Sequence, residues 1–348
     1  MEDLFKIKNP ENITYWIEDF CKHEEINSII ETKAFNRLYD ISFLGAIDYS
    51  SGNELPKANR NRAVHSLYVA GIANFIATER KYDDELKKHI VAAALLHDIG
   101  HMPLSHSVEP YIKLKFGYGH HEMGIDLILG HIQKGNELNH ILLKNFNITF
   151  IKQLLNNETN NDGSDIFSSK INADTIDGIV RCVENKCINK INSLNRISIA
   201  RAFFIKNSDY STIKRLDTLD SFWKTKHFVY QNYINTKHSA MSDRLSQIFF
   251  MTEEKEISVE NLLLKESTWK NKYRRLFKLL DELKNGSIPV CLREDEIEYT
   301  TRRYDVLEDE QSLDKRYVNS KQKNKLFQED YVEDNSTFNQ LELLDGEI

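Results

Sequence analysis

Proline, glycine and cysteine are all scarce in this chain of 348 residues. With 5 prolines and 13 glycines, it has too few turn-forming residues for a turn-rich all-β fold, so the composition favours helices. The 4 cysteines match no CxxC spacing, which argues against a zinc ribbon and against a disulfide framework. We therefore expect free thiols in a reducing, cytoplasmic setting.

Long apolar runs and an excess of basic charge are absent as well. The longest uninterrupted apolar run covers residues 90–96, much shorter than a bilayer span requires, and residues 1–6 lack the pattern of a secretory signal. The chain carries 46 basic and 53 acidic side chains, a net charge of −7. We accordingly expect no membrane partner and no long nucleic acid, because nucleic-acid phosphates attract basic surfaces.

The composition of the chain changes near residue 285. Before this point apolar residues recur every three or four positions, which is typical of amphipathic helices, and we expect a mainly α-helical core over residues 1–285. After it, charges of both signs and scattered tyrosines dominate, with a short apolar run at 288–292 that favours a strand. Residues 286–348 are expected to form a small α+β appendage or a charged tail. The later helices of the core are expected at about 171–187, 216–250 and 268–283.

Histidine is concentrated in one part of the sequence, because seven of the twelve histidines lie between residues 89 and 131. Histidine is an indifferent helix former, so a solvated helix has no reason to collect it. Within this stretch His97 and Asp98 stand at the end of an apolar helix, where Gly100 favours a turn. Imidazole nitrogen and carboxylate oxygen are both good ligands for divalent first-row metals. The pair therefore indicates a metal site.

Two other positions offer the remaining ligands. His65 lies on an apolar helical stripe, where an imidazole needs a partner, and Asp174 opens a helix. Together His65, His97, Asp98 and Asp174 would form an open site with two nitrogen donors and at least two oxygen donors, as metal-assisted hydrolysis requires. We expect a divalent cation, and Mn, Fe, Co, Ni, Zn and Mg are all compatible with these ligands.

A zinc pair of the HExxH type is a competing interpretation of His97 and His101. That motif requires a continuing helix with a glutamate after the first histidine. Here Asp98, Gly100 and Pro103 occupy the intervening and following positions, so this interpretation is disfavoured.

The order H…HD…D resembles the HD-domain superfamily of metal-dependent phosphohydrolases. Over about residues 25–250 the motifs are similar to those of its deoxynucleoside triphosphate triphosphohydrolase (dGTPase-like) branch. The resemblance implies an HD-domain helical bundle, a nucleotide substrate and a homo-oligomer. The segments that carry it are Phe35–Leu38, Leu44-Gly45, Asn61–Leu67, His97–His106, His121–Gly124 and Val229–Gln231.

The resemblance also implies roles for individual residues. His65, His97, Asp98 and Asp174 match the metal ligands of the family. His121 matches the histidine that acts as general acid, and Glu109 stands where an acidic residue orients it; His120 is an alternative for the acid. The residues expected to contact substrate are Arg62, His101, His106, Asp177 and Tyr230, although Arg62 could instead form a structural salt bridge.

Several positions depart from the motifs of the branch. Phe43 stands where a glutamine reads the 3′-hydroxyl of the sugar. Thr175 and Gly178 replace the lysine and tyrosine that hold the triphosphate, Cys182 replaces an aspartate, and Asn232 replaces a histidine. The metal site is retained in the sequence, while the contacts to sugar and triphosphate are altered.

Three functional hypotheses follow. The leading one is release of triphosphate from a deoxynucleoside triphosphate. The alternative is cleavage of a phosphomonoester or phosphodiester in another nucleotide. A third is a nucleotide-sensing module with weak turnover, which the altered substrate contacts keep open.

Overall fold

The fold is described from a computed structural model, for residues 9–51, 60–158, 161–185, 194–205, 211–252, 257–293 and 297–326. Most of these residues lie in helices, and the sheet that they form has two strands. The expected mainly α-helical fold is confirmed. None of the helices in the described residues combines the length and the apolar character needed to cross a membrane.

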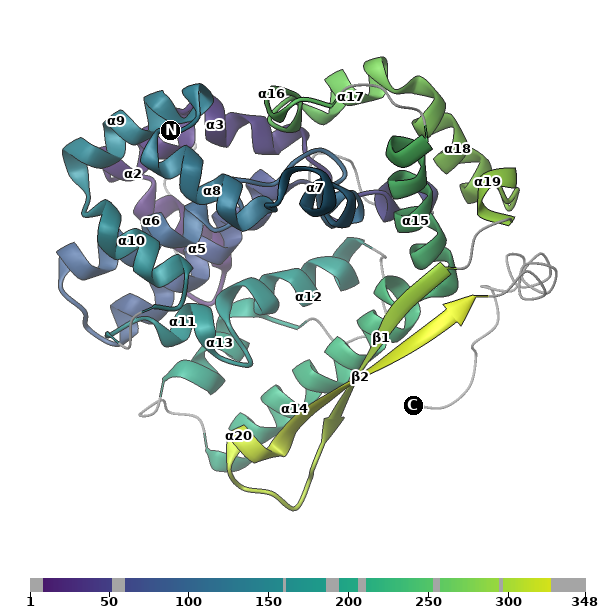
Figure 1. Ribbon diagram of the computed structural model, residues 1–348. Coiled ribbons are helices and arrows are strands. Elements are labelled where there is room, and N and C mark those ends of the chain that lie inside the picture. Colours follow the sequence, from purple (N-terminus) through teal and green to yellow (C-terminus); the bar gives the residue numbers. More distant parts are fainter. Residues whose placement is uncertain are drawn as a thin grey trace, which may run out of the picture.

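The elements follow one another along the chain as Figure 1 shows. The first group is α1 (Ile13–Phe20), α2 (Glu24–Glu31), α3 (Lys33–Asn36), η1 (Arg37–Asp40), α4 (Ile47–Ser50), α5 (Arg62–Glu79) and α6 (Asp84–Leu96). The second is η3 (Ser105–Ser107), α7 (Glu109–Phe116), α8 (His120–Leu129), η4 (Gln133–Gly135), α9 (Asn136–Asn145), α10 (Ile148–Leu155), α11 (Asp165–Ser168), α12 (Ala173–Asn185) and α13 (Arg196–Phe204). The third is α14 (Thr212–Val229), η5 (Tyr230–Ile234), α15 (Lys237–Thr252), α16 (Val259–Leu262), α17 (Glu266–Lys272), α18 (Arg274–Lys284), α19 (Val290–Arg293), β1 (Ile297–Val306), α20 (Leu313–Arg316) and β2 (Tyr317–Leu326).

Helix α5 is the central helix of the fold, since α1, α6, α12 and α13 all pack against it. Most of its side chains are buried, as expected for a helix surrounded by others rather than lying on a surface. Its start is fixed by Asn61, whose side chain accepts a hydrogen bond from the backbone N of Val64. His65 therefore lies one turn into a helix that four neighbours hold in place.

The two strands form an antiparallel hairpin that packs on α14. Its ends pair Ile297 with Leu326 and Val306 with Tyr317. Trp223 of α14 contacts Tyr304 and Tyr317, with ring centroids 5.4 Å and 5.2 Å away. Figure 1 shows the yellow hairpin running along α14. The position of the expected strand was wrong: residues 290–293 form the short helix α19 and the strands come later.

Two expected helices are each divided in the structure. The long helix expected over 216–250 is interrupted by the π-helical turn η5, and α15 restarts after Thr236, whose hydroxyl accepts from the backbone N of Ser239. The helix expected over 268–283 divides at Tyr273 into α17 and α18. Periodicity alone cannot reveal either break, because the apolar spacing continues across it.

Candidate metal centre and its surroundings

Four side chains converge where α5 and α12 begin and α6 ends. Nε2 of His65 lies 3.3 Å from Nε2 of His97 and 3.7 Å from Oδ2 of Asp98. It also lies 3.0 Å from Oδ1 of Asp174. The side chain of His65 is fully buried, whereas that of Asp174 is 59% exposed. The structure thus brings together all four residues expected as metal ligands, at a point open to solvent on the Asp174 side.

The Nδ1 atoms of His65 and His97 both face hydrogen-bond acceptors, which leaves their Nε2 atoms for a ligand. His97 Nδ1 lies 2.7 Å from the carbonyl O of Ala94, and His65 Nδ1 lies 2.6 Å from Oδ2 of Asp177. Both partners only accept hydrogen bonds, so each Nδ1 carries a proton, and the Nε2 lone pair of each ring is the one left for a cation when no second proton occupies it. Two such lone pairs beside two carboxylates fit a divalent cation.

The electrostatics of His65 agree with a site for positive charge. Burial alone lowers the pKa of this imidazole, but the hydrogen bonds to Asp174 and Asp177 outweigh burial and raise the pKa to about 8. A proton and a cation therefore compete for the same nitrogen.

Asp177, expected from the sequence to contact substrate, is placed behind His65 instead. Its side chain is fully buried. Besides His65, Oδ2 accepts from Nε of Arg181 at 2.7 Å and Oδ1 accepts from Nε of Arg196 at 2.6 Å. With both oxygens occupied and no exposed surface, Asp177 is a positioning residue for His65. This expectation was wrong because sequence spacing does not show which carboxylate of the pair faces inward.

Arg62 is likewise occupied by the protein. Its Nη1 donates to Oδ2 of Asp98 at 2.7 Å, Nη2 donates to the carbonyl O of Phe43 at 2.7 Å, and Nε donates to Ser105 Oγ at 3.3 Å. The side chain is buried. The salt-bridge alternative is the one that the structure shows, and Arg62 holds Asp98 in place rather than offering a free guanidinium to substrate.

A second group of histidines lies beside the metal centre. His101 and His120 are stacked, with ring centroids 4.0 Å apart, and His106 completes a set of three whose nitrogens lie within 4.8 Å of one another. His101 Nε2 lies 3.2 Å from Oδ1 of Asp98, which joins the two groups. Burial, aided by Arg62, holds the pKa of His101 well below its usual range, so this ring is neutral.

The pairing expected between Glu109 and His121 was wrong. Oε1 of Glu109 lies 2.7 Å from Nδ1 of His120 and accepts from its backbone N at 3.1 Å, while Oε2 lies 3.1 Å from Nδ1 of His106. These bonds outweigh burial and lower the pKa of Glu109. His121 is exposed, because α8 starts at His120 and turns the next side chain about 100° away.

The approach of α8 depends on Gly100. A Cβ at Gly100 would lie 2.0 Å from the carbonyl O of His120, so only glycine allows the start of α8 to come this close to the end of α6. The turn that follows is strained, since Leu104 and Ser105 have φ values of 60° and 44°.

Glu266 of α17 supports that turn from a distant part of the sequence. Its fully buried carboxylate accepts from the backbone N of Leu104 at 2.8 Å, from the hydroxyl of Tyr49 at 2.5 Å and from the backbone N and hydroxyl of Ser42. Nothing in the sequence marks this glutamate, because its partners lie more than 160 residues away. It was missed for that reason.

Lys226 of α14 is a second residue that the sequence did not indicate. It is only 7% exposed, and its ammonium lies over the rings of Trp223 and Tyr304 at 4.8 Å and 4.7 Å. Burial lowers its pKa to about 8, opposed by the charge of Asp174. Tyr230, expected to contact substrate, lies next to it on η5, 4.8 Å from the Tyr304 ring. A lysine in a helix that carries charges of both signs does not indicate a binding site by itself, so the sequence did not single out Lys226.

Two of the departures from the family motifs lie next to each other. The ring of Phe43 is 4.9 Å from the ring of His65, and a Cβ at Gly178 would meet the Phe43 ring at 3.7 Å. The aromatic ring of Phe43 thus lies next to Gly178, which has no side chain. The substitutions alter one wall of the metal centre together.

Comparison with known proteins supports the family resemblance. Residues 62–177 match the family model described as HD domain, a segment that contains all four candidate metal ligands. The expected resemblance to HD-domain proteins is confirmed.

Curated relatives match part of the chain. An uncharacterized protein of Methanocaldococcus jannaschii, MJ1154, is 34% identical over 47% of this chain and 31% of its own length. Mouse deoxynucleoside triphosphate triphosphohydrolase SAMHD1 is 32% identical over 38% of this chain and 22% of its own length. A deoxyguanosinetriphosphate triphosphohydrolase-like protein of Caldanaerobacter subterraneus is 36% identical over 29% and 27%. The match thus spans about a third or less of these relatives.

Proposed function

We propose that this HD-domain chain is a metal-dependent phosphohydrolase that cleaves a phosphate ester or anhydride bond in a nucleotide. One observation carries the proposal: Nε2 atoms of His65 and His97 and carboxylates of Asp98 and Asp174 converge, while both Nδ1 atoms are held from behind. Sites with His and carboxylate donors and open positions support hydrolysis.

The residues divide the chemistry among them. His65, His97, Asp98 and Asp174 would hold a divalent cation, which when bound would supply Lewis-acid activation of the phosphoryl group and of a water. His120, whose Nδ1 is held by Glu109, is placed to donate a proton from Nε2 to the departing oxygen. His101 stacks on His120 and restricts its ring. The exposed His121 remains the alternative donor. Single substitutions of His120 and of His121 distinguish the two, because only loss of the proton donor should lower turnover.

The leading substrate is a deoxynucleoside triphosphate that loses its triphosphate in one step. The names of the mouse and Caldanaerobacter relatives support this choice. In place of the lysine absent at Thr175, Lys226 supplies a buried cation that is electrostatically coupled to Asp174. Of the other expected substrate contacts, His106 is exposed and Tyr230 is partly exposed.

The alternative, cleavage of a phosphomonoester or phosphodiester of another nucleotide, rests on the wall formed by Phe43 and Gly178. Phenylalanine offers no hydrogen bond to a sugar hydroxyl. A substrate recognised through stacking or through its phosphate alone suits this wall better than one recognised by its 3′-hydroxyl.

Product analysis tests both versions. Purified protein is incubated with Mn²⁺, or with EDTA, and with a panel of dNTPs, NTPs, nucleoside monophosphates and cyclic dinucleotides, and the products are identified by mass spectrometry. Intact triphosphate from a dNTP supports the leading version, whereas orthophosphate or an opened cyclic nucleotide supports the alternative. The double variant His97→Ala/Asp98→Ala should abolish either product.

Absence of turnover would overturn the proposal for this panel. If a nucleotide still binds under those conditions, the chain acts as a nucleotide sensor.

We further propose a homo-oligomer, as the resemblance to the dGTPase-like branch implies. Light scattering of the purified chain measures its oligomeric state.

A further inference from the structure

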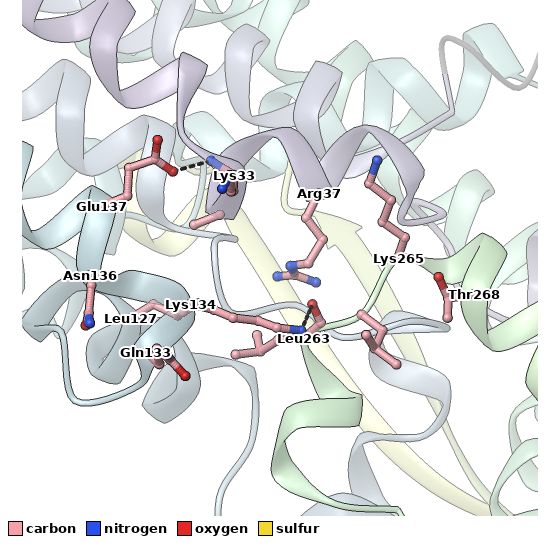
Figure 2. A pocket seen from close by; sticks show the side chains of 12 residues that line it. Lys33, Arg37, Leu127, Gln133, Lys134, Asn136, Glu137, Leu263, Lys265 and Thr268 are labelled. Atoms are coloured by element: carbon pink, nitrogen blue, oxygen red, sulfur yellow. Dashed lines mark hydrogen bonds between the residues drawn. The ribbon is translucent and has the colours of Figure 1, made fainter.

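A separate pocket of about 650 Å³ lies behind the turn that follows the metal ligands. It is enclosed by α3 and η1 on one side, by α8, η4 and α9 on another, and by the segment 263–268 that leads into α17 (Figure 2). No candidate metal ligand and no histidine of the second group lines it. Its volume falls within the range of small-molecule sites, about 300–1,000 Å³.

The charged side chains of this pocket are mostly basic. Lys33, Arg37, Lys134 and Lys265 line it, against the single carboxylate of Glu137. That carboxylate accepts from the backbone N of Lys33 at 2.9 Å, at the start of α3. Among the described residues, no carboxylate lies within ion-pair distance of any of the four side-chain cations.

Arg37 is the lining cation that most favours an anionic ligand. Its side chain is only 5% exposed. Nη1 donates to the carbonyl O of His101 at 2.5 Å and Nη2 to that of Ile99 at 2.8 Å. Carbonyl groups satisfy hydrogen bonds but do not neutralise charge, and a buried cation without a counter-ion is costly. Burial accordingly lowers the pKa of Arg37 to about 10.

Lys134 lines the same pocket with an exposed side chain. Its ammonium donates to the carbonyl O of Leu263 at 3.1 Å and to that of Glu260 at 3.3 Å. Figure 2 shows Arg37 extending from its helix toward Lys134 and Leu263. Burial and the charge of Arg37 lower the pKa of Lys134, opposed by the charge of Glu260. Arg37 and Lys134 therefore repel each other, and an anion bound between them would relieve this repulsion.

We propose that this pocket, lined by Lys33, Arg37, Lys134 and Lys265, binds a small phosphate-bearing anion at a site separate from the metal centre. Phosphate oxygens pair well with a guanidinium fork and with an ammonium. Apolar walls formed by Ala34, Leu127 and Leu263 leave room for an organic body attached to the phosphate. Through Arg37 the anion is connected to the backbone at Ile99 and His101, directly beyond the ligands His97 and Asp98.

Isothermal titration calorimetry with pyrophosphate, ADP and adenosine tests the site. The full chain is used in EDTA, so that no added metal recruits phosphate to the His65 cluster. We expect pyrophosphate and ADP to bind and adenosine not to bind. Equal affinity of pyrophosphate and ADP assigns the site to inorganic anions, and tighter binding of ADP assigns it to organic phosphates; both outcomes support the proposal.

Charge-removing variants locate the binding. Lys134→Gln should weaken pyrophosphate at least tenfold, and Lys33→Gln, which removes an exposed side chain, provides a second variant if the first fails to fold. Lys144→Gln on the neighbouring helix α9, and Lys226→Gln near the metal centre, should leave the affinity unchanged. The proposal is overturned by wild-type protein that binds neither anion, by adenosine that binds as well as ADP, or by an affinity that responds to Lys226→Gln but not to Lys134→Gln or Lys33→Gln.

Discussion

At the scale of single residues, the candidate metal centre depends on side chains that are not among its four proposed ligands. His65 presents Nε2 only because Asp177 fixes its ring through Nδ1, and Asp177 is itself held by Arg181 and Arg196. Arg62 holds Asp98 in the same manner. Outer contacts of this kind set the orientation and basicity of metal ligands.

Replacing Asp177 with asparagine should therefore weaken metal binding. The amide no longer holds the His65 proton on Nδ1 by charge, and we expect the affinity for Mn²⁺ to fall by about 10- to 100-fold. Calorimetry well below the unfolding temperature measures this, with the exposed Asp217→Asn as the matched control. Unchanged affinity in a folded Asp177→Asn protein would show that His65 is oriented by other contacts.

Titration of Asp243 in α15 should make the free energy of unfolding depend on pH. Burial raises its pKa to about 6, opposed by a hydrogen bond from Ser107, and its Oδ1 has no hydrogen-bond partner. An unfolded aspartate titrates near pH 3.9, so the folded state binds more protons between these values and stability falls as pH rises from about 4 to 6.

The variant Asp243→Asn removes that loss. We expect its free energy of unfolding to exceed that of the wild type by about 1–3 kcal/mol at pH 8 and to show no gain near pH 4. Urea unfolding at the two pH values measures the difference. A gain of the same size at both pH values would exclude titration of Asp243 as its source.

At the scale of elements, the structure joins segments that the sequence shows only separately. The apolar period, the cap residues and the HD motif were sufficient to predict the helices that supply His65, His97, Asp98 and Asp174 and their convergence. The strand position and the break at η5 were not predictable, because the apolar spacing gives no signal for either. The choice of His120 over His121 as the partner of Glu109 depends on the residue at which α8 begins. Glu266 is the clearest case of a contact between distant segments, since it accepts a hydrogen bond from the strained turn at Leu104, 162 residues away in the sequence.

Glu266→Gln should destabilise the protein and lower turnover together. The amide presents a donor to the hydroxyls and backbone groups that now donate to Glu266, so at least one of them loses its acceptor. We expect a loss of about 1–3 kcal/mol in unfolding free energy and a lower kcat, because the turn at Leu104 positions Ser105 against Arg62. Denaturant unfolding and steady-state kinetics measure the two effects, and the exposed Glu18→Gln should show neither.

Helix α14 and the β1–β2 hairpin together bury Lys226. If it binds the phosphate chain, Lys226→Gln should raise KM by about tenfold, as expected for the loss of a charge-assisted contact, while Mn²⁺ affinity stays the same. Lys224→Gln, two residues away and exposed, is the control. A changed Mn²⁺ affinity with an unchanged KM would place Lys226 with the metal centre instead of with the substrate.

At the scale of the whole molecule, a bound cation would link α5, the end of α6 and α12 in addition to the hydrogen bonds that already join them. A ligand that binds only the folded state adds stability by mass action, about 2.7 kcal/mol at 100 times its Kd. We therefore expect saturating Mn²⁺ to raise the unfolding temperature and EDTA to lower it. The variant His97→Ala should show the same temperature in both conditions, and a shift that persists in this variant would indicate binding elsewhere.

The ligand set also has a consequence for the time course of synthesis. His65 and Asp174 are 109 residues apart, Arg196 follows 19 residues after the Asp177 that it holds, and Glu266 bonds to Ser42 across 224 residues. Chains emerge from the ribosome at about 5–20 residues per second, so the ligands, their supports and the turn are completed in succession. A nascent chain that ends before about residue 266 lacks part of these contacts, so the proposed nucleotide hydrolysis would be delayed until translation is well advanced.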